Sequence, residues 1–260
     1  MLAPKWSGGS KLFYQDLLSG QEPGMLLFAI VALVAGIIRG FTGFGGPAFI
    51  LAILTLFYPP AAIVSKILIA DFLSNIYLFH SCFKSIDWRS TAFLSVPSVL
   101  LIPLGQWLLI ELDPLQMKQV ISIIISGICI LLLVGFRYRA MPGFYSLIAV
   151  GIIAGIVFGA TYIALVTVCF ILLGPYEKSA GRNLIISWAF FTVVGFAIIS
   201  IAMGTVTMID LTTALPGAAS YLFGTWLGSR FFSNASEKLF RRSAIGLLFA
   251  IALMNLSQSI

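Results

Sequence analysis

The sequence predicts an all-α polytopic membrane protein made of two inverted repeats, each a broken-helix hairpin plus three transmembrane helices. Three observations lead to this prediction. Of the 260 residues, 60% are hydrophobic and only 9% are charged, which excludes an ordinary soluble domain. Apolar blocks of membrane length recur along the chain. Two of these blocks are too long for a single crossing, and they head two similar halves.

Eight apolar blocks, separated by short polar or proline-containing loops, define the expected elements. They fall at about 24–57, 61–80, 90–110, 114–135, 142–174, 183–203, 211–229 and 243–256. A single helix over 24–57 would be about 51 Å long, whereas the hydrocarbon core is about 30 Å thick. The helix must therefore tilt steeply, protrude or break.

The stretch GFTGFGGP at residues 40–47 marks the expected break in the first long block. Glycine tolerates positive φ, and proline is accepted in the first turn of a helix, where its missing N–H leaves no bond unmade. We therefore expect Gly40 to end the first helix segment and Pro47 to open the second. Irregular backbone at this depth is tolerated only where it is buried in protein or lines a cavity.

The remaining composition excludes several other classes of protein and site. Residues 1–23 contain charged residues but no apolar core ahead of a cleavage site, so we expect an interfacial segment and not a cleaved signal peptide. The net charge of +6 suits cytoplasmic loops of a membrane protein better than nucleic-acid binding. Cys82, Cys129 and Cys169 are scattered, which supports neither a disulfide framework nor a metal site, and we expect no cofactor.

The second half repeats the first at an offset of 119 residues. The stretch AGIIRGFT at 35–42 aligns with AGIVFGAT at 154–161, and Pro97 and Trp107 align with Pro216 and Trp226. Shared proline, glycine and tryptophan at one spacing are harder to attribute to chance than shared aliphatic residues. We therefore expect a first repeat over 24–136 and a second over 142–260.

The basic residues of the loops indicate how the long blocks cross. If each long block returns to its own side as a hairpin, one side keeps only Lys5, Lys11 and Lys118, and the other holds Lys84, Arg89, Arg137, Arg139, Lys178, Arg182, Arg230, Lys238, Arg241 and Arg242. If each long block crosses once, the split is six against seven. Because cytoplasmic loops carry excess Lys and Arg, the hairpin arrangement is favoured.

The hairpin arrangement fixes the relation of the two halves and the sides of the termini. Each half then makes three full crossings, and an odd number inverts the second half relative to the first, as in many secondary transporters. Both termini are expected outside the cytoplasm, in a multi-pass protein of the inner (plasma) membrane. The two hairpin tips, near 40–47 and 159–162, would approach the midplane from opposite sides.

The first tip has the features of an anion site. Gly43, Gly45 and Gly46 allow close approach to the backbone, and the returning helix would point its N–H groups and positive dipole end at the tip. Arg39 adds a full positive charge at a depth where a lone Arg is unfavourable. Alternatively, the glycines serve tight helix packing and Arg39 reaches the membrane surface.

The second tip, Gly159-Ala160-Thr161-Tyr162, offers hydroxyl groups in place of a glycine cluster. If the two tips form one site, that site is asymmetric, with Thr42, Thr161 and Tyr162 as candidate hydrogen-bond donors to the substrate. A packing role for Tyr162 is an equal alternative, because aromatic side chains are common in packed helices.

Polar residues within the expected helix 61–80 are candidates for coupling or gating. Asp71 lies near the middle, Asn75 follows on the same face, and Lys66 lies nearer one end. An ionisable group at this depth is a functional candidate by default. Asp71 could carry a proton, or it could be a fixed partner of Arg39 or Lys66. Its counterpart in the second half is Ser187.

Arg182 opens the equivalent helix of the second half. It could attract anions from the cytoplasm, so it joins the candidates for coupling or gating. A topology charge in a cytoplasmic loop is the favoured interpretation.

Several motifs along the chain belong together: AGIIRGFTGFGGPAFILAIL at 35–54, Pro59-Pro60, Ile86-Asp87-Trp88, Gly105-x-Trp107, GIIAGIVFGATY at 151–162 and Leu227-Gly228-x-Arg230. In these motifs the sequence resembles the TauE/SafE family of sulfite exporter-like membrane permeases. It departs from the commoner glycine run at Pro47 and in the second tip. The resemblance implies transport of a small sulfur-containing anion, such as sulfite, thiosulfate or a sulfonate like sulfoacetate.

We therefore expect a secondary transporter that works by alternating access and has a small anion and membrane lipids as partners. Proton coupling through Asp71 is a further hypothesis, and a homodimer is left open. An anion channel or a carboxylate permease is the alternative function, and a structural membrane subunit is a third. An intramembrane enzyme is not expected, because no second catalytic group or His-rich motif accompanies Asp71.

Overall fold

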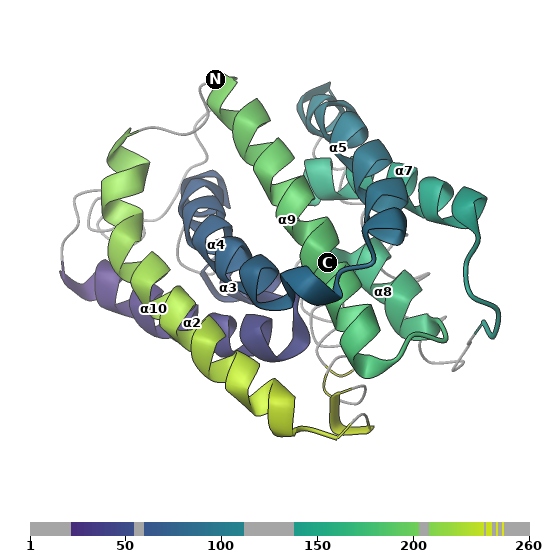
Figure 1. Ribbon diagram of the computed structural model, residues 1–260. Helices are drawn as coiled ribbons and strands as arrows, with labels where there is room; N and C mark the ends of the chain where they lie inside the picture. The colour runs from purple at the N-terminus through teal and green to yellow at the C-terminus, as the bar shows by residue number, and fades with distance from the viewer. Residues whose placement is uncertain are drawn as a thin grey trace.

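The structure, a computed structural model, describes residues 22–54, 60–111, 138–202, 208–236, 238–240, 243 and 246. The helices are α2 (Glu22–Thr42), α3 (Gly46–Leu54), α4 (Pro60–Cys82), η1 (Phe83–Ser85), α5 (Trp88–Glu111), α7 (Phe144–Thr161), α8 (Leu165–Leu173), α9 (Lys178–Ala202) and α10 (Met208–Asn234), as Figure 1 shows. No strand occurs among these residues, so the predicted all-α class is confirmed. The predicted blocks 114–135 and 243–256 and residues 1–21 lie outside the described residues, apart from positions 243 and 246.

Three of the described helices are long and apolar enough to cross a membrane. They are α5 over Trp88–Leu108, α7 over Phe144–Thr161 and α9 over Lys178–Ala202. The helices α4 and α10 reach 23 and 27 residues and also have membrane length. The chain is therefore an integral membrane protein.

The first long block breaks as predicted, but Gly40 does not end its first segment. Helix α2 continues to Thr42, and the left-handed residues are Gly43 (φ 85°) and Gly45 (φ 83°). The Gly43 N–H donates to the carbonyl oxygen of Arg39 at 2.8 Å, which closes the helix in the way a C-terminal glycine usually does. Pro47 lies in the first turn of α3, as predicted.

Gly40 instead allows close packing, as does Gly36. A methyl group on Gly36 would collide with the carbonyl oxygen of Tyr221, and one on Gly40 with that of Thr225. Both carbonyl groups belong to α10, so α2 and α10 touch backbone to backbone. For Gly40 the packing alternative is therefore correct, and Gly36 packs in the same way, as expected where small residues bring membrane helices together.

The second long block breaks at the matching position, with one left-handed residue in place of two, and that residue is not a glycine. Tyr162 follows α7 in the left-handed region (φ 58°), and its N–H donates to the carbonyl oxygen of Phe158 at 2.7 Å. The break then runs to Ala164, and α8 begins at Leu165. A non-glycine residue with positive φ is uncommon and marks a position that its surroundings hold in place.

The two breaks begin and end at matching positions at the offset of 119, but Gly45 (φ 83°) is left-handed and its counterpart Ala164 (φ −77°) is not. Gly43 matches Tyr162, and α3, Gly46–Leu54, matches α8, Leu165–Leu173, at both ends. The hydroxyl groups of Thr42 and Thr161 donate to the carbonyl oxygens four residues earlier, each at 2.7 Å. This correspondence supports the predicted duplication. The inverted placement of the halves and the repeat boundaries stay predictions.

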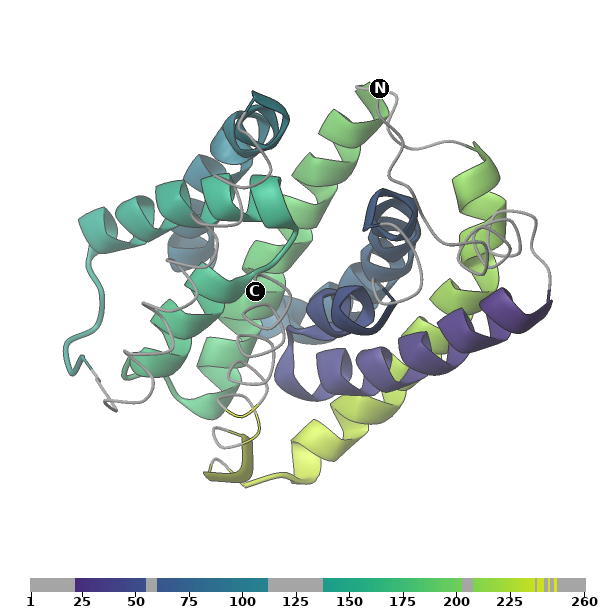
Figure 2. The ribbon, with the colours of Figure 1, turned by 180° about the vertical axis from the view of Figure 1, so that it is seen from behind.

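The two halves exchange their last described helices. Helix α10 of the second half packs against α2 and α4 of the first, and α5 of the first half packs against α7 and α9 of the second. Figures 1 and 2 show α9 with α5, α7 and α8 on one side of it and α4, which it contacts, on the other. We call α2, α3, α4 and α10 the first bundle, and α5, α7, α8 and α9 the second bundle.

Several basic loops meet at one end of the molecule, which we call the basic end. Lys178 donates to the carbonyl oxygens of Phe232 at 2.9 Å and Ala235 at 2.6 Å, which joins the start of α9 to the end of α10. Leu78, Cys82 and Ile86 share a buried apolar cluster with Ile186 of α9, so the end of α4 and the loop that follows it lie beside the first half of α9. The Tyr138 hydroxyl group donates to the carbonyl oxygen of Phe170, on α8, at 2.9 Å.

The segments that meet at the basic end carry Lys84, Arg89, Arg139, Lys178, Arg230 and Lys238. The single-crossing arrangement would place Arg89 and Lys178 on opposite sides of the membrane. The observed contacts favour the hairpin arrangement, in which these loops share one side.

Candidate functional site

A small cavity lies where the two helix breaks meet. Its volume is about 30 Å³, enough for about two water molecules. The lining residues come from both bundles and are Arg39, Phe44, Gly45, Pro47, Ala48, Asp71, Phe158, Tyr162, Ile163, Ala164, Leu165, Ala189 and Val193. The predicted tips, 40–47 and 159–162, thus face one common space.

Two helix N-termini face this cavity. The first hydrogen bond of α3 runs from the Phe49 N–H to the carbonyl oxygen of Gly45, and that of α8 from the Val168 N–H to the carbonyl oxygen of Ala164. The N–H groups that precede Phe49 and Val168 have no partner within their own helices. Both helices also direct the positive ends of their dipoles at the cavity, which favours an anion there.

The polar wall of the cavity is an ion pair. Arg39 and Asp71 are each 2% exposed, and the Arg39 Nε lies 3.3 Å from the Asp71 Oδ1. Arg39 also donates to the carbonyl oxygen of Gly43 at 2.9 Å and to the Asn75 Oδ1 at 2.7 Å. The alternative in which Arg39 reaches the membrane surface is therefore wrong. Of the two partners considered for Asp71, the structure selects Arg39.

The carboxylate of Asp71 has two further hydrogen-bond donors. The Asn75 side-chain amide donates to the Asp71 Oδ2 at 2.9 Å, and the Tyr221 hydroxyl group donates to the Asp71 Oδ1 at 3.0 Å. A methyl group on Gly46 would collide with the Tyr221 hydroxyl oxygen, so the absent side chain at position 46 lets Tyr221 reach the carboxylate. The ion pair thus belongs to a network that joins α2, α4 and α10.

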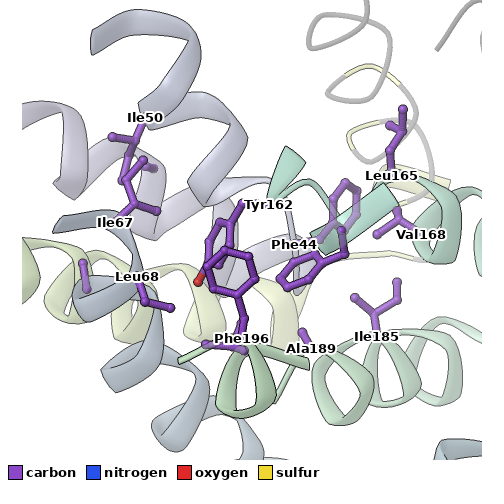
Figure 3. Packing of buried hydrophobic residues seen from close by; sticks show 14 of the residues in the cluster. Phe44, Ile50, Ile67, Leu68, Tyr162, Leu165, Val168, Ile185, Ala189 and Phe196 are labelled. Atoms are coloured by element: carbon purple, nitrogen blue, oxygen red, sulfur yellow. The ribbon is translucent and has the colours of Figure 1, made fainter. Parts of the chain in front are cut away.

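Tyr162 brings a polar atom from the second break to the same cavity. Its side chain is 3% exposed, and its hydroxyl group faces the Asp71 carboxylate but forms no hydrogen bond of normal length and geometry among the described residues. The ring packs edge-on against Phe196, with the ring centroids 4.9 Å apart, and Figure 3 shows both rings. Tyr162 therefore packs as a core residue and also offers an unused hydroxyl group to the cavity.

The other predicted substrate-binding residues hold the breaks and do not line the cavity. Thr42 and Thr161 direct their hydroxyl groups at their own helix ends and accept the N–H groups of Phe44 and Ile163, each at 3.2 Å. Gly43 packs against the side chain of Arg182, and Gly46 packs against Tyr221. Their contact with substrate stays a prediction.

The favoured interpretation of Arg182, a topology charge in a cytoplasmic loop, is wrong. Arg182 lies in α9, is 5% exposed, and donates to the carbonyl oxygen of Gly40 near the C-terminus of α2. Its guanidinium group also lies 4.2 Å from the centroid of the Phe232 ring. A cation at a helix C-terminus is favourable, so Arg182 stabilises the broken end of α2 from the second bundle.

The remaining coupling candidates lie apart from the cavity. Lys66 is buried in α4 and does not line it. The Ser187 hydroxyl group lies 2.8 Å from that of Thr91, so Ser187 faces α5. Ser187, the repeat counterpart of Asp71, therefore does not reach the cavity.

Sequence reasoning did not identify Tyr221 or the apolar part of the lining. Tyr221 lies 150 residues from Asp71 and follows no motif that would connect the two. The one signal available was a phenol group in the middle of an apolar block. In the sequence, nothing distinguishes Phe158, Leu165 and Val193 from other apolar residues of membrane helices. Only the fold brings them to the cavity.

Comparison with known proteins identifies the family. The family model described as Sulfite exporter TauE/SafE matches residues 28–255. The chain belongs to this family. It is therefore a membrane transporter of the sulfite-exporter class, as the resemblance implied. Neither the search of curated proteins nor the search of solved structures gave a match.

Proposed function

We propose that this chain is a secondary carrier that moves a small sulfur-containing anion, such as sulfite, thiosulfate or a sulfonate like sulfoacetate, by alternating access. The observation that carries the proposal is the pair of helix N-termini, α3 and α8, that face one buried cavity. Two such N-termini supply unpaired N–H donors without adding a mobile charge. Membership of the sulfite-exporter family agrees with an anionic substrate.

The substrate is expected to bind between Gly45 and Ala48 on one side and Tyr162 and Leu165 on the other. The oxygen atoms of a sulfite or sulfonate group would accept hydrogen bonds from the N–H groups of α3 and α8 and from the Tyr162 hydroxyl group. Arg39 would supply the compensating charge. The N-terminal cradle alone does not distinguish a sulfonate from a carboxylate, so carboxylates belong in the substrate panel.

A carrier fits the cavity better than a channel does. The space holds about two water molecules, so an anion of several atoms requires the surrounding helices to move apart. Since each bundle carries one break, the bundles are the natural moving units, with the α4·α9 contact between them. The two halves of the sequence are not separate moving units, because α5 of the first half packs against the second half and α10 of the second half packs against the first.

We place the protein in the inner (plasma) membrane, with the basic end in the cytoplasm and both termini on the other side. Labelling of single cysteines tests this arrangement. Arg89→Cys and Lys238→Cys are both exposed positions, and an impermeant thiol reagent should reach them from the cytoplasmic side in inverted vesicles and not in intact cells. Opposite labelling of the two positions would contradict the hairpin arrangement.

Transport in proteoliposomes tests the function. Vesicles that contain the protein should exchange labelled sulfite, thiosulfate or a sulfonate with saturable kinetics, above the rate of protein-free vesicles. Tyr162→Phe should raise the KM several-fold, because it removes only the unused hydroxyl group. Tyr138→Phe is the matched control, since it removes a hydroxyl group at the basic end. Large unsaturating conductance would favour a channel, and no anion movement would contradict transport.

A further inference from the structure

Asp71 neutralises the positive charge of Arg39, which a transported anion would need. Its carboxylate is paired with Arg39 inside the cavity, and both side chains are buried. A substrate anion that approached Arg39 would meet a second negative charge only a few ångströms away, in a region that excludes most water. Two anions so close in a low-dielectric site repel strongly, and a proton on one of them removes the repulsion.

The groups that face Asp71 show how its charge is controlled. From α2 comes Arg39, from its own helix Asn75, from α10 Tyr221, and from the second break Tyr162. The parts of α3 and α9 that line the cavity are Pro47, Ala48, Ala189 and Val193, which bear no titratable group. Among the described residues that line the cavity, Arg39 is therefore the counter-charge of Asp71.

On the basis of the proposed transport function, we infer that Asp71 is an internal competitor of the substrate and that one proton is bound with each anion. In the empty carrier, the Asp71 carboxylate neutralises Arg39. When the anion binds, a proton from the same side adds to Asp71, and the anion takes over Arg39. The proton leaves Asp71 as the anion leaves, and the ion pair forms again. Anion and proton thus travel in the same direction.

Charge balance makes this inference specific. Protonation of Asp71 adds one positive charge to the site, so a monoanion and its proton cross together without net charge movement. A dianion such as thiosulfate would carry one net negative charge. The empty carrier, with Arg39 and Asp71 paired, is neutral at the cavity and can return without a substrate.

Tyr221 and Asn75 are positioning residues in this scheme. They donate to the ionised carboxylate from two directions and hold it on Arg39 while the site is empty. After protonation, the new O–H group of Asp71 requires an acceptor. The hydroxyl oxygen of Tyr221 lies 3.0 Å from the Asp71 Oδ1, and Tyr162 lines the cavity beside Asp71. The unused hydroxyl group of Tyr162 therefore fits both the substrate and the protonated aspartate.

Calorimetric binding to the purified full chain tests the inference. The probes are methanesulfonate and thiosulfate, because both stay fully ionised between about pH 5 and pH 8 and take up no proton themselves. Titrations in buffers of different ionisation enthalpy give the number of protons bound with each anion. We expect about one proton at the upper end of this range, with the affinity falling about tenfold per pH unit there.

Variants distinguish the role of Asp71 from a general loss of structure. Asp71→Asn should bind the probes with an affinity that no longer depends on pH and with no proton uptake. Tyr221→Phe should keep proton uptake but move the pH at which binding weakens upward, because the ionised carboxylate has lost a donor. Ser74→Ala is the matched control, since it removes another buried α4–α10 hydrogen bond, 2.9 Å long, away from the cavity.

The outcomes separate this inference from the proposed function. Probe binding without proton uptake by the wild-type chain would overturn the inference and leave anion transport intact. An unchanged pH dependence in Asp71→Asn would overturn it as well. Absence of binding and transport for every probe at about pH 5 would instead contradict the proposed function. If Asp71→Asn does not fold, the wild-type proton count still decides.

Discussion

Arg39 is buried together with the carboxylate that neutralises it. An unpaired Arg in the hydrocarbon region is unfavourable by about 2.5 to 3.5 kcal/mol on insertion scales. The pair with Asp71, together with the hydrogen bonds to Gly43 and Asn75, removes most of this penalty. The same contacts hold the charge at the broken end of α2, where a ligand can reach it.

Arg39→Gln should therefore destabilise the protein, because it leaves Asp71 buried without its counter-charge. We expect a loss of about 3 to 5 kcal/mol in the free energy of unfolding, measured by thermal or denaturant unfolding in detergent. The double variant Arg39→Gln, Asp71→Asn should recover most of this loss, since it removes both charges. A double variant as unstable as the single one would show that the pair itself is not the cause.

The residues that keep this network together could be predicted only in part. Arg39, Asp71 and Asn75 stand out because charged and amide groups are rare in an apolar block. Tyr221 does not stand out, since its importance depends on the packing of α10 over Gly46. Likewise, Gly40 and Gly43 look equally able to end a helix, and only the contact of Gly40 with Thr225 shows why the helix continues past it.

The pairing of α2 with α10 depends on glycines that admit a neighbouring backbone. Gly36→Ala should separate the two helices, because the new methyl group meets the carbonyl group of Tyr221. We expect a loss of about 1 to 3 kcal/mol in stability. Gly143→Ala is the control, since a methyl group there meets nothing within 4 Å. Equal melting temperatures for the two variants would contradict the close packing.

The start of α5 depends on Asp87, the residue just before Trp88. Its Oδ1 accepts the N–H groups of Arg89 at 3.1 Å and Ser90 at 3.2 Å, which is the usual cap of a helix N-terminus. The hydrogen bond from the Ser90 hydroxyl group lowers the pKa of Asp87. The Ile86-Asp87-Trp88 motif of the family resemblance therefore has a structural role here.

Asp87→Ala should lower the stability by about 1 kcal/mol at neutral pH. Because the folded-state pKa lies below that of the unfolded chain, the contribution of the carboxylate is present above about pH 4 and is lost as the pH falls further. Unfolding of both proteins between about pH 3 and pH 7 measures this. A stability difference that grows on acidification would contradict the capping role.

The molecule as a whole consists of two bundles, whose main helix contact is that of α4 with α9. The repeat in the sequence predicted two similar units, and the matching breaks support that prediction. The exchange of α5 and α10 between the units could not be predicted, because the apolar faces of membrane helices show little preference for one neighbour over another. It changes which parts are expected to move.

If the bundles move against each other, a link between α4 and α9 should stop transport. The rings of Phe79 and Phe190 stack with centroids 4.0 Å apart across this contact. In a chain without its native cysteines, Phe79→Cys with Phe190→Cys and a short bifunctional reagent should arrest sulfite exchange, and a reductant that cleaves the reagent should restore it.

Tyr77→Cys with Ser229→Cys gives the matched link inside the first bundle. The two native hydroxyl groups lie 3.3 Å apart, so the two positions face each other across α4 and α10. This link should leave most of the exchange rate intact. Arrest by both links, or by neither, would contradict motion between the bundles.

The location of a bound anion tests the central claim most directly. A structure with a bromine-labelled alkanesulfonate would show the bromine by its anomalous scattering. The sulfonate should lie between the N-termini of α3 and α8, within hydrogen-bond distance of the Tyr162 hydroxyl group. A sulfonate bound elsewhere, for example in the apolar groove between α5 and α9, with the cavity at the breaks unchanged, would contradict the claim.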